Sequence, residues 1–163
     1  MACMQTNRSK RQSCQKKVRL TLECDEVWSY MGQRRHKVWL WLAMHRDTRE
    51  IVALQVGDRS RASAQALWQQ VPPLYRQCAV CYTDTWDAYL TVLPSKRHRI
   101  IANRRGTNHS ERFNNTLWQR LARLVRRTLS FAKKLDNLLG SLWFFVHAYN
   151  AAIARSFHPS LPI

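Results

Sequence analysis

Acidic side chains are a small minority in this chain of 163 residues, which has 10 Asp and Glu against 27 Lys and Arg. Three of them stand where chemistry is possible: Asp25 in an alternating segment, Asp84 after a short apolar run, and Glu111 in the first turn of a helical pattern. Carboxylates from a strand, a neighbouring strand end and a helix start can converge as hard oxygen ligands for Mg²⁺. Two such ions can activate a water or hydroxyl and stabilise the leaving oxygen in phosphodiester chemistry.

The residues alone leave open which acids act together. Glu23 and Asp25 share one face of the alternating segment and Glu26 lies on the other, so alternation does not choose between the first two. Asp84 is a site candidate by position, because ligand sites in α/β sheets lie beyond the carboxyl ends of strands. The plainer interpretation is that Asp84 is a turn residue and that Glu111 only complements its helix dipole.

The elements that must position these acids follow from hydrophobic periodicity. Residues 18–24 alternate as a half-buried strand, and the continuous apolar run 38–44 indicates a central strand. Further strands are predicted at 51–56, 78–83 and 99–102, and helices at 62–70, 86–92, 110–127 and 133–152. A three-strand meander followed by strands joined through helices predicts an α/β domain, with a mixed five-stranded sheet flanked by helices and a long C-terminal helix.

The cysteines favour a reducing compartment. Cys78 and Cys81 have the spacing of half a zinc site, but both fall in the apolar run 78–83, so we interpret them as buried structural thiols. The chain has five cysteines, an odd number, and its first residues carry charge without an apolar stretch, which predicts a cytoplasmic protein. The longest apolar run, 38–44, is far shorter than the roughly 20 residues of a membrane helix, so no membrane partner is expected.

The net charge predicts a polyanionic partner. A formal charge of +17 repels itself in a compact fold, and the basic residues are spread along the chain, so nucleic acid is the expected partner. One basic run follows Glu111; a solvated charged face is its alternative interpretation. Its members are Arg120, Arg123, Arg126, Arg127, Lys133 and Lys134.

Four ordered segments carry a resemblance to a known family: LECDEVWSYMGQRRHKVWLWLA, RQCAVCYTDTWDAY, LPSKRHR and TNHSERFNNTLWQRLARLVRRTLSFAKKL. They resemble the InsB-type DDE transposases of insertion sequence one, and the resemblance covers roughly residues 18–150. It implies an RNase H-like fold whose site takes one carboxylate from the first strand, one from the fourth strand and one from a late helix. Matched motif by motif, these are Asp25, Asp84 and Glu111, as catalytic residues and as metal ligands.

The resemblance also implies an activity. A transposase of this family uses Mg²⁺ or Mn²⁺, here expected as two ions, to cleave DNA at the element ends and to direct the freed 3′-hydroxyl against target DNA. Asp25 and Asp84 would bridge the metals, and Glu111 would complete one ion's shell. A nuclease of the same fold and a non-catalytic DNA-binding or regulatory protein are the alternatives.

The implied partners are DNA, further copies of the chain on DNA, and an upstream zinc-binding and helix-turn-helix region of the active fusion form. The implied location is the bacterial nucleoid. We expect residues 1–17 to form a flexible basic leader, residues 18–152 the catalytic domain and residues 153–163 a C-terminal tail.

One departure from the family concerns the DNA contact beside Glu111. Many DDE enzymes carry Lys or Arg seven residues after the Glu, and here that position is Trp118. Arg112 or Arg126 is the candidate substitute, and Trp118 is a candidate to stack on a base. Asn115, within about 40° of Glu111 on a helical wheel, completes the predicted DNA-binding set.

Overall fold

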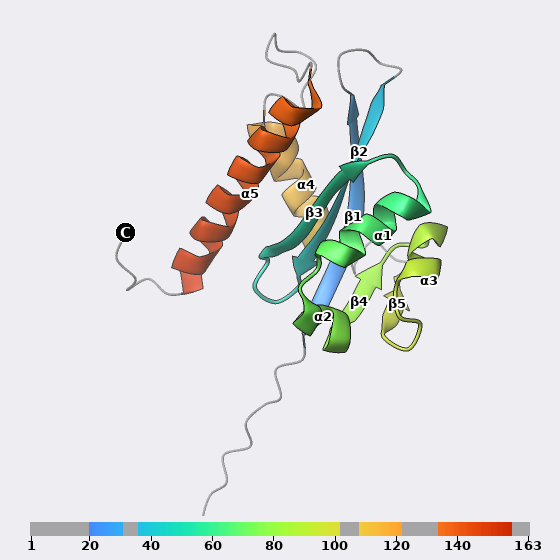
Figure 1. Cartoon of the computed structure of the whole chain (residues 1–163). Helices are drawn as coiled ribbons and strands as arrows, with labels where there is room; N and C mark the ends of the chain where they lie inside the picture. The colour runs from blue at the N-terminus through green and yellow to red at the C-terminus, as the bar shows by residue number, and fades with distance from the viewer. Residues whose placement is uncertain (1–19, 31–35, 102–107, 122–133, 158–163) are drawn as a thin grey trace, which may run out of the picture.

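A mixed five-stranded sheet with helices on both faces forms the body of the chain (Figure 1). The computed structural model describes residues 20–30, 36–101, 108–121 and 134–157. Its elements are β1 (Thr21–Tyr30), β2 (Lys37–His45), β3 (Ile51–Gly57), α1 (Arg61–Gln70), α2 (Pro73–Cys78), β4 (Val80–Thr83), α3 (Asp87–Val92), β5 (His98–Ile100), α4 (Asn108–Arg120) and α5 (Leu135–Phe157).

The strand order β3-β2-β1-β4-β5 places β1 at the centre of the sheet. β1 pairs antiparallel with β2, in the meander that the sequence predicts, and parallel with β4, which in turn pairs parallel with β5. These pairings, with the flanking helices and the long α5, confirm the predicted α/β class and are consistent with an RNase H-like fold.

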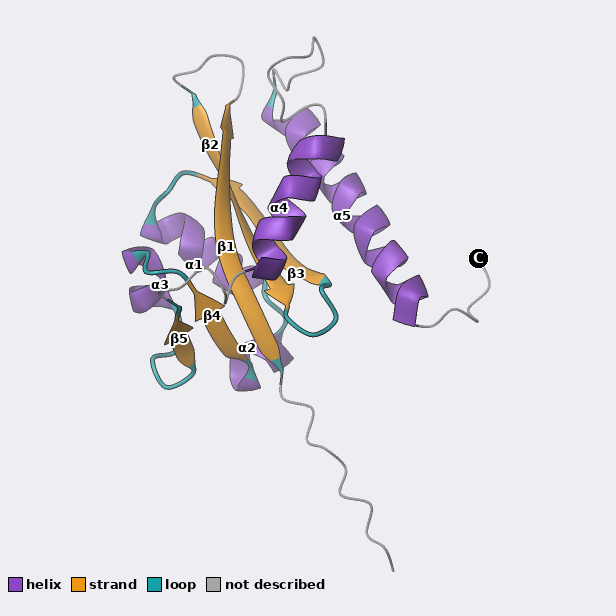
Figure 2. Cartoon of the chain, turned by 180° about the vertical axis from the view of Figure 1, so that it is seen from behind, coloured by secondary structure: helices purple, strands orange, loops and turns teal. Residues whose placement is uncertain are grey.

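Two helical layers cover the two faces of the sheet. α1 and α3 lie on one face, and α4 and α5 lie on the other (Figures 1 and 2). Side chains of β2 alternate between the two cores: Trp41 and Ala43 pack with α1, while Leu40 and Leu42 pack with α4 and α5. This alternation explains why the run 38–44 is apolar at every position, as a strand covered on both faces requires.

The prediction that the first strand is half-buried is wrong. Leu22 and Cys24 are buried on the α1 face, and Glu23, on the opposite face, is 0% exposed beneath α4. Apolar and polar residues do alternate along β1, but α4 covers the polar face and excludes solvent from it. Hydrophobic periodicity cannot detect such cover when an acid occupies the covered face.

The predicted strand 78–83 begins later than expected. α2 occupies Pro73–Cys78, with the proline at its first turn, and β4 starts at Val80. Cys78 therefore ends a helix and is exposed, so its prediction as a buried thiol is wrong, whereas Cys81 is buried as predicted. Proline is well tolerated in the first turn of a helix, because its missing N–H has no intrahelical partner there.

The last two helices also differ from the predicted bounds. α4 ends at Arg120 within the described residues, and residues 122–133 lie outside them, so the rest of the predicted helix 110–127 is not described. α5 continues past the predicted end at 152 to Phe157. No helix in the described ranges has both the length and the apolarity needed to cross a membrane.

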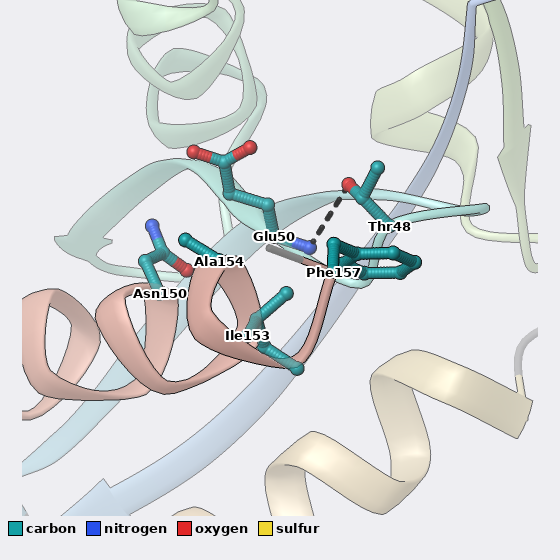
Figure 3. Close-up of a pocket in the computed structure, with 6 residues that line it drawn as sticks. All are labelled: Thr48, Glu50, Asn150, Ile153, Ala154 and Phe157. Atoms are coloured by element: carbon teal, nitrogen blue, oxygen red, sulfur yellow. Dashed lines mark hydrogen bonds between the residues drawn. The ribbon is translucent and has the colours of Figure 1, made fainter. Parts of the chain in front are cut away.

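Asn150 joins α5 to the edge of the sheet. Its side-chain Oδ1 accepts from the backbone N–H of Ile51, and its Nδ2 donates to the Ile51 carbonyl, both at 2.9 Å. The amide thus pairs with β3 as a neighbouring strand would. Beside it, the β2–β3 turn and the end of α5 enclose a hollow of about 380 Å³, lined in part by Thr48 and Phe157 and containing none of the three predicted site acids (Figure 3).

Candidate active site

The pairing of β1 with β4 brings Asp25 and Asp84 into the same region of the sheet. Thr21 lies opposite Val80 and Glu23 opposite Tyr82 in this parallel register. Asp84 comes just after the end of β4, and its charge raises the pKa of Asp25, so the two carboxylates lie near each other. Asp25 itself lies on the α4 side of β1, whereas the charge of Asp84 acts on Asp25 and also on Glu26 of the opposite face.

Asp25 is held at the contact between β1 and α4. Its Oδ2 accepts a hydrogen bond from Nδ2 of Asn114 at 2.9 Å, and its Oδ1 accepts one from the backbone N–H of Glu26, also at 2.9 Å. A hydrogen bond from the Ser110 side chain also reaches it. Ser110 and Asn114 are one helical turn apart, so a single face of α4 covers this carboxylate.

Burial, together with the negative charges of Glu26 and Asp84, raises the pKa of Asp25 to about 7. The hydrogen bonds from the Glu26 backbone and from Ser110 act in the opposite direction, because they stabilise the charged form. Ionised Asp25 is therefore a poorly compensated negative charge in a confined place. A cation at this carboxylate removes that electrostatic cost.

Asp84 is fixed by the turn that follows β4. Its Oδ1 accepts from the backbone N–H of Trp86 at 3.0 Å, as is typical of an aspartate that caps its own turn. This hydrogen bond agrees with the interpretation of Asp84 as a turn residue. This carboxylate, held in place by the turn, lies near enough to Asp25 for its charge to raise the Asp25 pKa.

Glu26 lies on the opposite face of β1, in a compensated environment. Its side chain is 3% exposed and accepts from Nη2 of Arg59 at 2.8 Å and from the hydroxyl of Tyr89 at 3.2 Å. The Arg59 guanidinium lies between the rings of Trp39 and Trp86, at 4.5 and 3.7 Å from their centroids. Burial raises the pKa of Glu26 and Arg59 lowers it, so the ion pair offsets part of the burial.

Glu111 follows Ser110 in the first turn of α4 and is exposed. It lines a hollow of about 430 Å³ together with Val27, Asn114, Asn115 and Trp118. Asn114 is shared between this hollow and Asp25, so the helix face that carries Glu111 borders the Asp25 site.

The donor set fits a divalent cation. Asp25 and Asp84 supply hard carboxylate oxygens, and Oδ1 of Asn114 is buried without a hydrogen-bond donor within the described part of the chain. No three His, Cys, Asp or Glu side chains among the described residues lie close enough to hold a metal ion together. Among the described residues, Asp25, Asp84 and Glu111 are accordingly not gathered closely enough to hold one ion together.

Comparison with known proteins shows the family of this chain. A family model described as IS1 transposase matches residues 18–148. The chain belongs to the IS1 transposase family.

Two curated relatives illustrate the extent of the similarity. InsB of insertion element IS1 from Shigella flexneri is 36% identical over 114 residues, which are 70% of this chain and 84% of that protein. InsB of insertion element IS1 4 from Escherichia coli (strain K12) is 35% identical over 114 residues, again 70% of this chain but 66% of that protein. The match thus leaves about a third of the E. coli relative uncovered.

The predicted DNA-binding residues of this IS1 family member are only partly described. Arg112 and Asn115 are exposed on α4, and Arg120 is exposed at its end, as is Lys134 just before α5. Trp118 lines the Glu111 hollow and also packs against the core beneath α4 and α5. The remaining predicted members, Arg123, Arg126, Arg127 and Lys133, lie outside the described residues.

Sequence reasoning missed the side chains that support the acids. Asn114 bonds Asp25, Arg59 pairs with Glu26, and Arg46 lies 3.2 Å from Glu23. One signal was available: Asn114 stands four residues after Ser110, on the same helix face. No local signal in the sequence indicated Arg46 or Arg59, because each arginine contacts its acid only in the tertiary structure.

Proposed function

We propose that this chain is the catalytic part of an IS1 transposase that cleaves DNA and transfers the cut strand to a target, with divalent metal ions. The observation that supports the proposal is that Asp84, just after β4, lies near enough to Asp25 on β1 for its charge to raise the Asp25 pKa, and that Asp25 contacts the helix that bears Glu111. Family membership supports the reaction class, and the net charge of +17 supports DNA as the substrate.

The residues have separate roles in this proposal. Asp25 and Asp84 would hold the metal between them, and Glu111 would complete its shell from α4. When bound, Mg²⁺ or Mn²⁺ supplies Lewis acidity that activates a water or a 3′-hydroxyl and stabilises the leaving oxygen. Asn114 keeps the Asp25 carboxylate oriented, and the Trp86 N–H does the same for Asp84.

The DNA contacts also belong to the proposal. Arg112, Asn115 and Arg120 are exposed on the helix that carries Glu111, where they can meet phosphates. Trp118 offers a ring at the edge of the Glu111 hollow. Recognition of the element ends, assembly of several copies on DNA and cooperation with an upstream zinc-binding region are extensions of the same proposal.

A plasmid assay tests the cleavage step. The purified chain is incubated with supercoiled plasmid at low salt, with Mg²⁺, Mn²⁺ or EDTA, beside Asp84→Asn and Glu111→Gln. We expect nicked or linear DNA only with metal and only with the wild-type chain. Asp47→Asn, a substitution of an exposed aspartate in the β2–β3 turn, is the control and should cleave normally.

The same assay separates the alternatives. Metal-dependent cleavage that persists in Asp84→Asn would overturn the site assignment. Cleavage without joining of an oligonucleotide that carries a free 3′-hydroxyl would favour the nuclease. Tight, salt-sensitive DNA binding by all variants with no cleavage would favour a non-catalytic DNA-binding or regulatory protein.

A further inference from the structure

Glu23 is a fully buried carboxylate to which the proposed reaction assigns no role. It lies on β1 two residues before Asp25, on the same face, and is 0% exposed. Its Oε2 accepts a hydrogen bond from the backbone N–H of Ser110 at 3.2 Å. Its Oε1 lies 3.2 Å from Nε of Arg46 in an ion pair without a directed hydrogen bond.

Glu23 caps the first turn of α4 through its contact with Ser110. α4 begins at Asn108, so Ser110 belongs to the first turn, whose N–H groups have no partner within the helix. A carboxylate at this end also interacts favourably with the helix dipole. Glu23 thus supplies, from β1, what a capping side chain normally supplies from the helix itself.

Arg46 compensates the charge that this cap requires. A buried carboxylate without a cation is strongly unfavourable, and Arg46 is the basic group in contact with Glu23. The Arg46 guanidinium also lies over the ring of Tyr82 on β4, 4.6 Å from its centroid. The anchor therefore connects α4, β1 and the strand that leads to Asp84.

We propose that Glu23 is a positioning residue that fixes the first turn of α4, so that Glu111 is held beside Asp25. Ser110 contacts Glu23 through its backbone and Asp25 through its side chain, and Glu111 is the next residue. Asn114, one turn on, makes the second attachment to Asp25. The inference rests on the proposed function for the role of Glu111, whereas the anchoring of α4 is testable without it.

Two variants of Glu23 distinguish the contribution of its hydrogen-bond acceptor from the contribution of its side-chain volume. Glu23→Gln keeps a side-chain oxygen for the Ser110 N–H, and Glu23→Leu fills similar space without an acceptor. Leu67→Ala is the matched control, because Leu67 lies on α1, is buried in the core on the other face of the sheet, and its truncation destabilises the fold without touching α4.

Hydrogen exchange of the metal-free full chain gives the first readout. We expect the Ser110 amide to exchange at least about tenfold faster in Glu23→Leu than in Leu67→Ala, measured relative to the amides of β2, and Glu23→Gln to retain most of the protection. Equal Ser110 protection in Glu23→Leu and Leu67→Ala would overturn the anchor.

Metal dependence of plasmid cleavage gives the second readout. In Glu23→Leu we expect the Mg²⁺ concentration for half-maximal cleavage to rise at least about threefold and kcat to fall about tenfold or more, with KM for DNA unchanged and with recovery in Glu23→Gln. Loss of cleavage with wild-type metal dependence, as expected for Leu67→Ala, would overturn the positioning role. A wild-type chain that does not cleave refutes the proposed function, and the exchange result then decides on the anchor alone.

Discussion

Asp25→Asn is expected to stabilise the metal-free protein although it removes a proposed catalytic residue. Burial and neighbouring acids raise the pKa of Asp25 from 3.8 to about 7. At about 1.4 kcal/mol per pKa unit, keeping this carboxylate ionised costs about 4 kcal/mol of folding free energy at neutral pH. Asparagine removes that cost but loses hydrogen bonds to a charged acceptor, worth about 1–3 kcal/mol. A net gain of about 1–3 kcal/mol remains.

The sign of the pH dependence follows from the raised pKa. Between about pH 4 and pH 7, folded Asp25 binds a proton that the unfolded chain has released, so the stability of the wild type falls as pH rises through this window. Above about pH 7 both states are ionised and the cost stays constant. The stability gain of Asp25→Asn over the wild type should therefore grow from pH 4 to pH 7 and then level off.

Urea unfolding followed by tryptophan fluorescence measures this difference, in EDTA and then in Mg²⁺. Metal that binds at Asp25 should stabilise the wild type, by about 2.7 kcal/mol at a hundredfold excess over Kd, and leave Asp25→Asn unchanged. Asp47→Asn controls for the loss of one negative charge from a chain of net charge +17. A destabilised Asp25→Asn at pH 8, or equal stabilisation of both proteins by Mg²⁺, would refute the reasoning.

Three further outcomes follow from the described contacts. Gly57→Ala should lower the free energy of unfolding in urea by about 1–3 kcal/mol, because its Cβ would lie 2.5 Å from a serine hydroxyl. Gly140→Ala should raise it by about 0.5–1 kcal/mol, because nothing lies within 4 Å of the added Cβ. Equal effects of the two substitutions would contradict the packing. Arg59→Met should destabilise by about 2 kcal/mol at pH 8 and by less as the pH falls, since burial raises the pKa of Glu26 and the variant removes the cation that lowers it; a pH-independent loss would argue against the ion pair. Iodoacetamide at pH 8 should label Cys78 in the native chain well before the buried cysteines of β1 and β4, whose thiol pKa values are raised, and mass spectrometry of the peptides would expose the opposite order.

The sequence predicted correctly those elements whose signals are local. The apolar run of β2 is visible because both of its faces are core, and α1 begins where Ser60 caps it, with the Ser60 side chain accepting from the N–H of Ser63. α2 was missed because Pro72 and Pro73 indicate a break, and a break can equally be a helix start. The cover over the polar face of β1 depends on α4, which is more than 80 residues away in sequence, and no local pattern encodes it.

The choice between Glu23 and Asp25 shows what the tertiary structure adds to the alternation of β1. The two acids share a face, and periodicity treats them alike. In the fold, Glu23 is fully enclosed and its charge is matched by Arg46 and the Ser110 N–H, so binding a further cation would require breaking those contacts. Asp25 lies beside two further acids and its pKa is raised, so its charge is undercompensated. A compensated acid can hold a helix in place, whereas an undercompensated acid gains from binding a cation, and on this ground we propose the anchor role for Glu23 and the metal-binding role for Asp25.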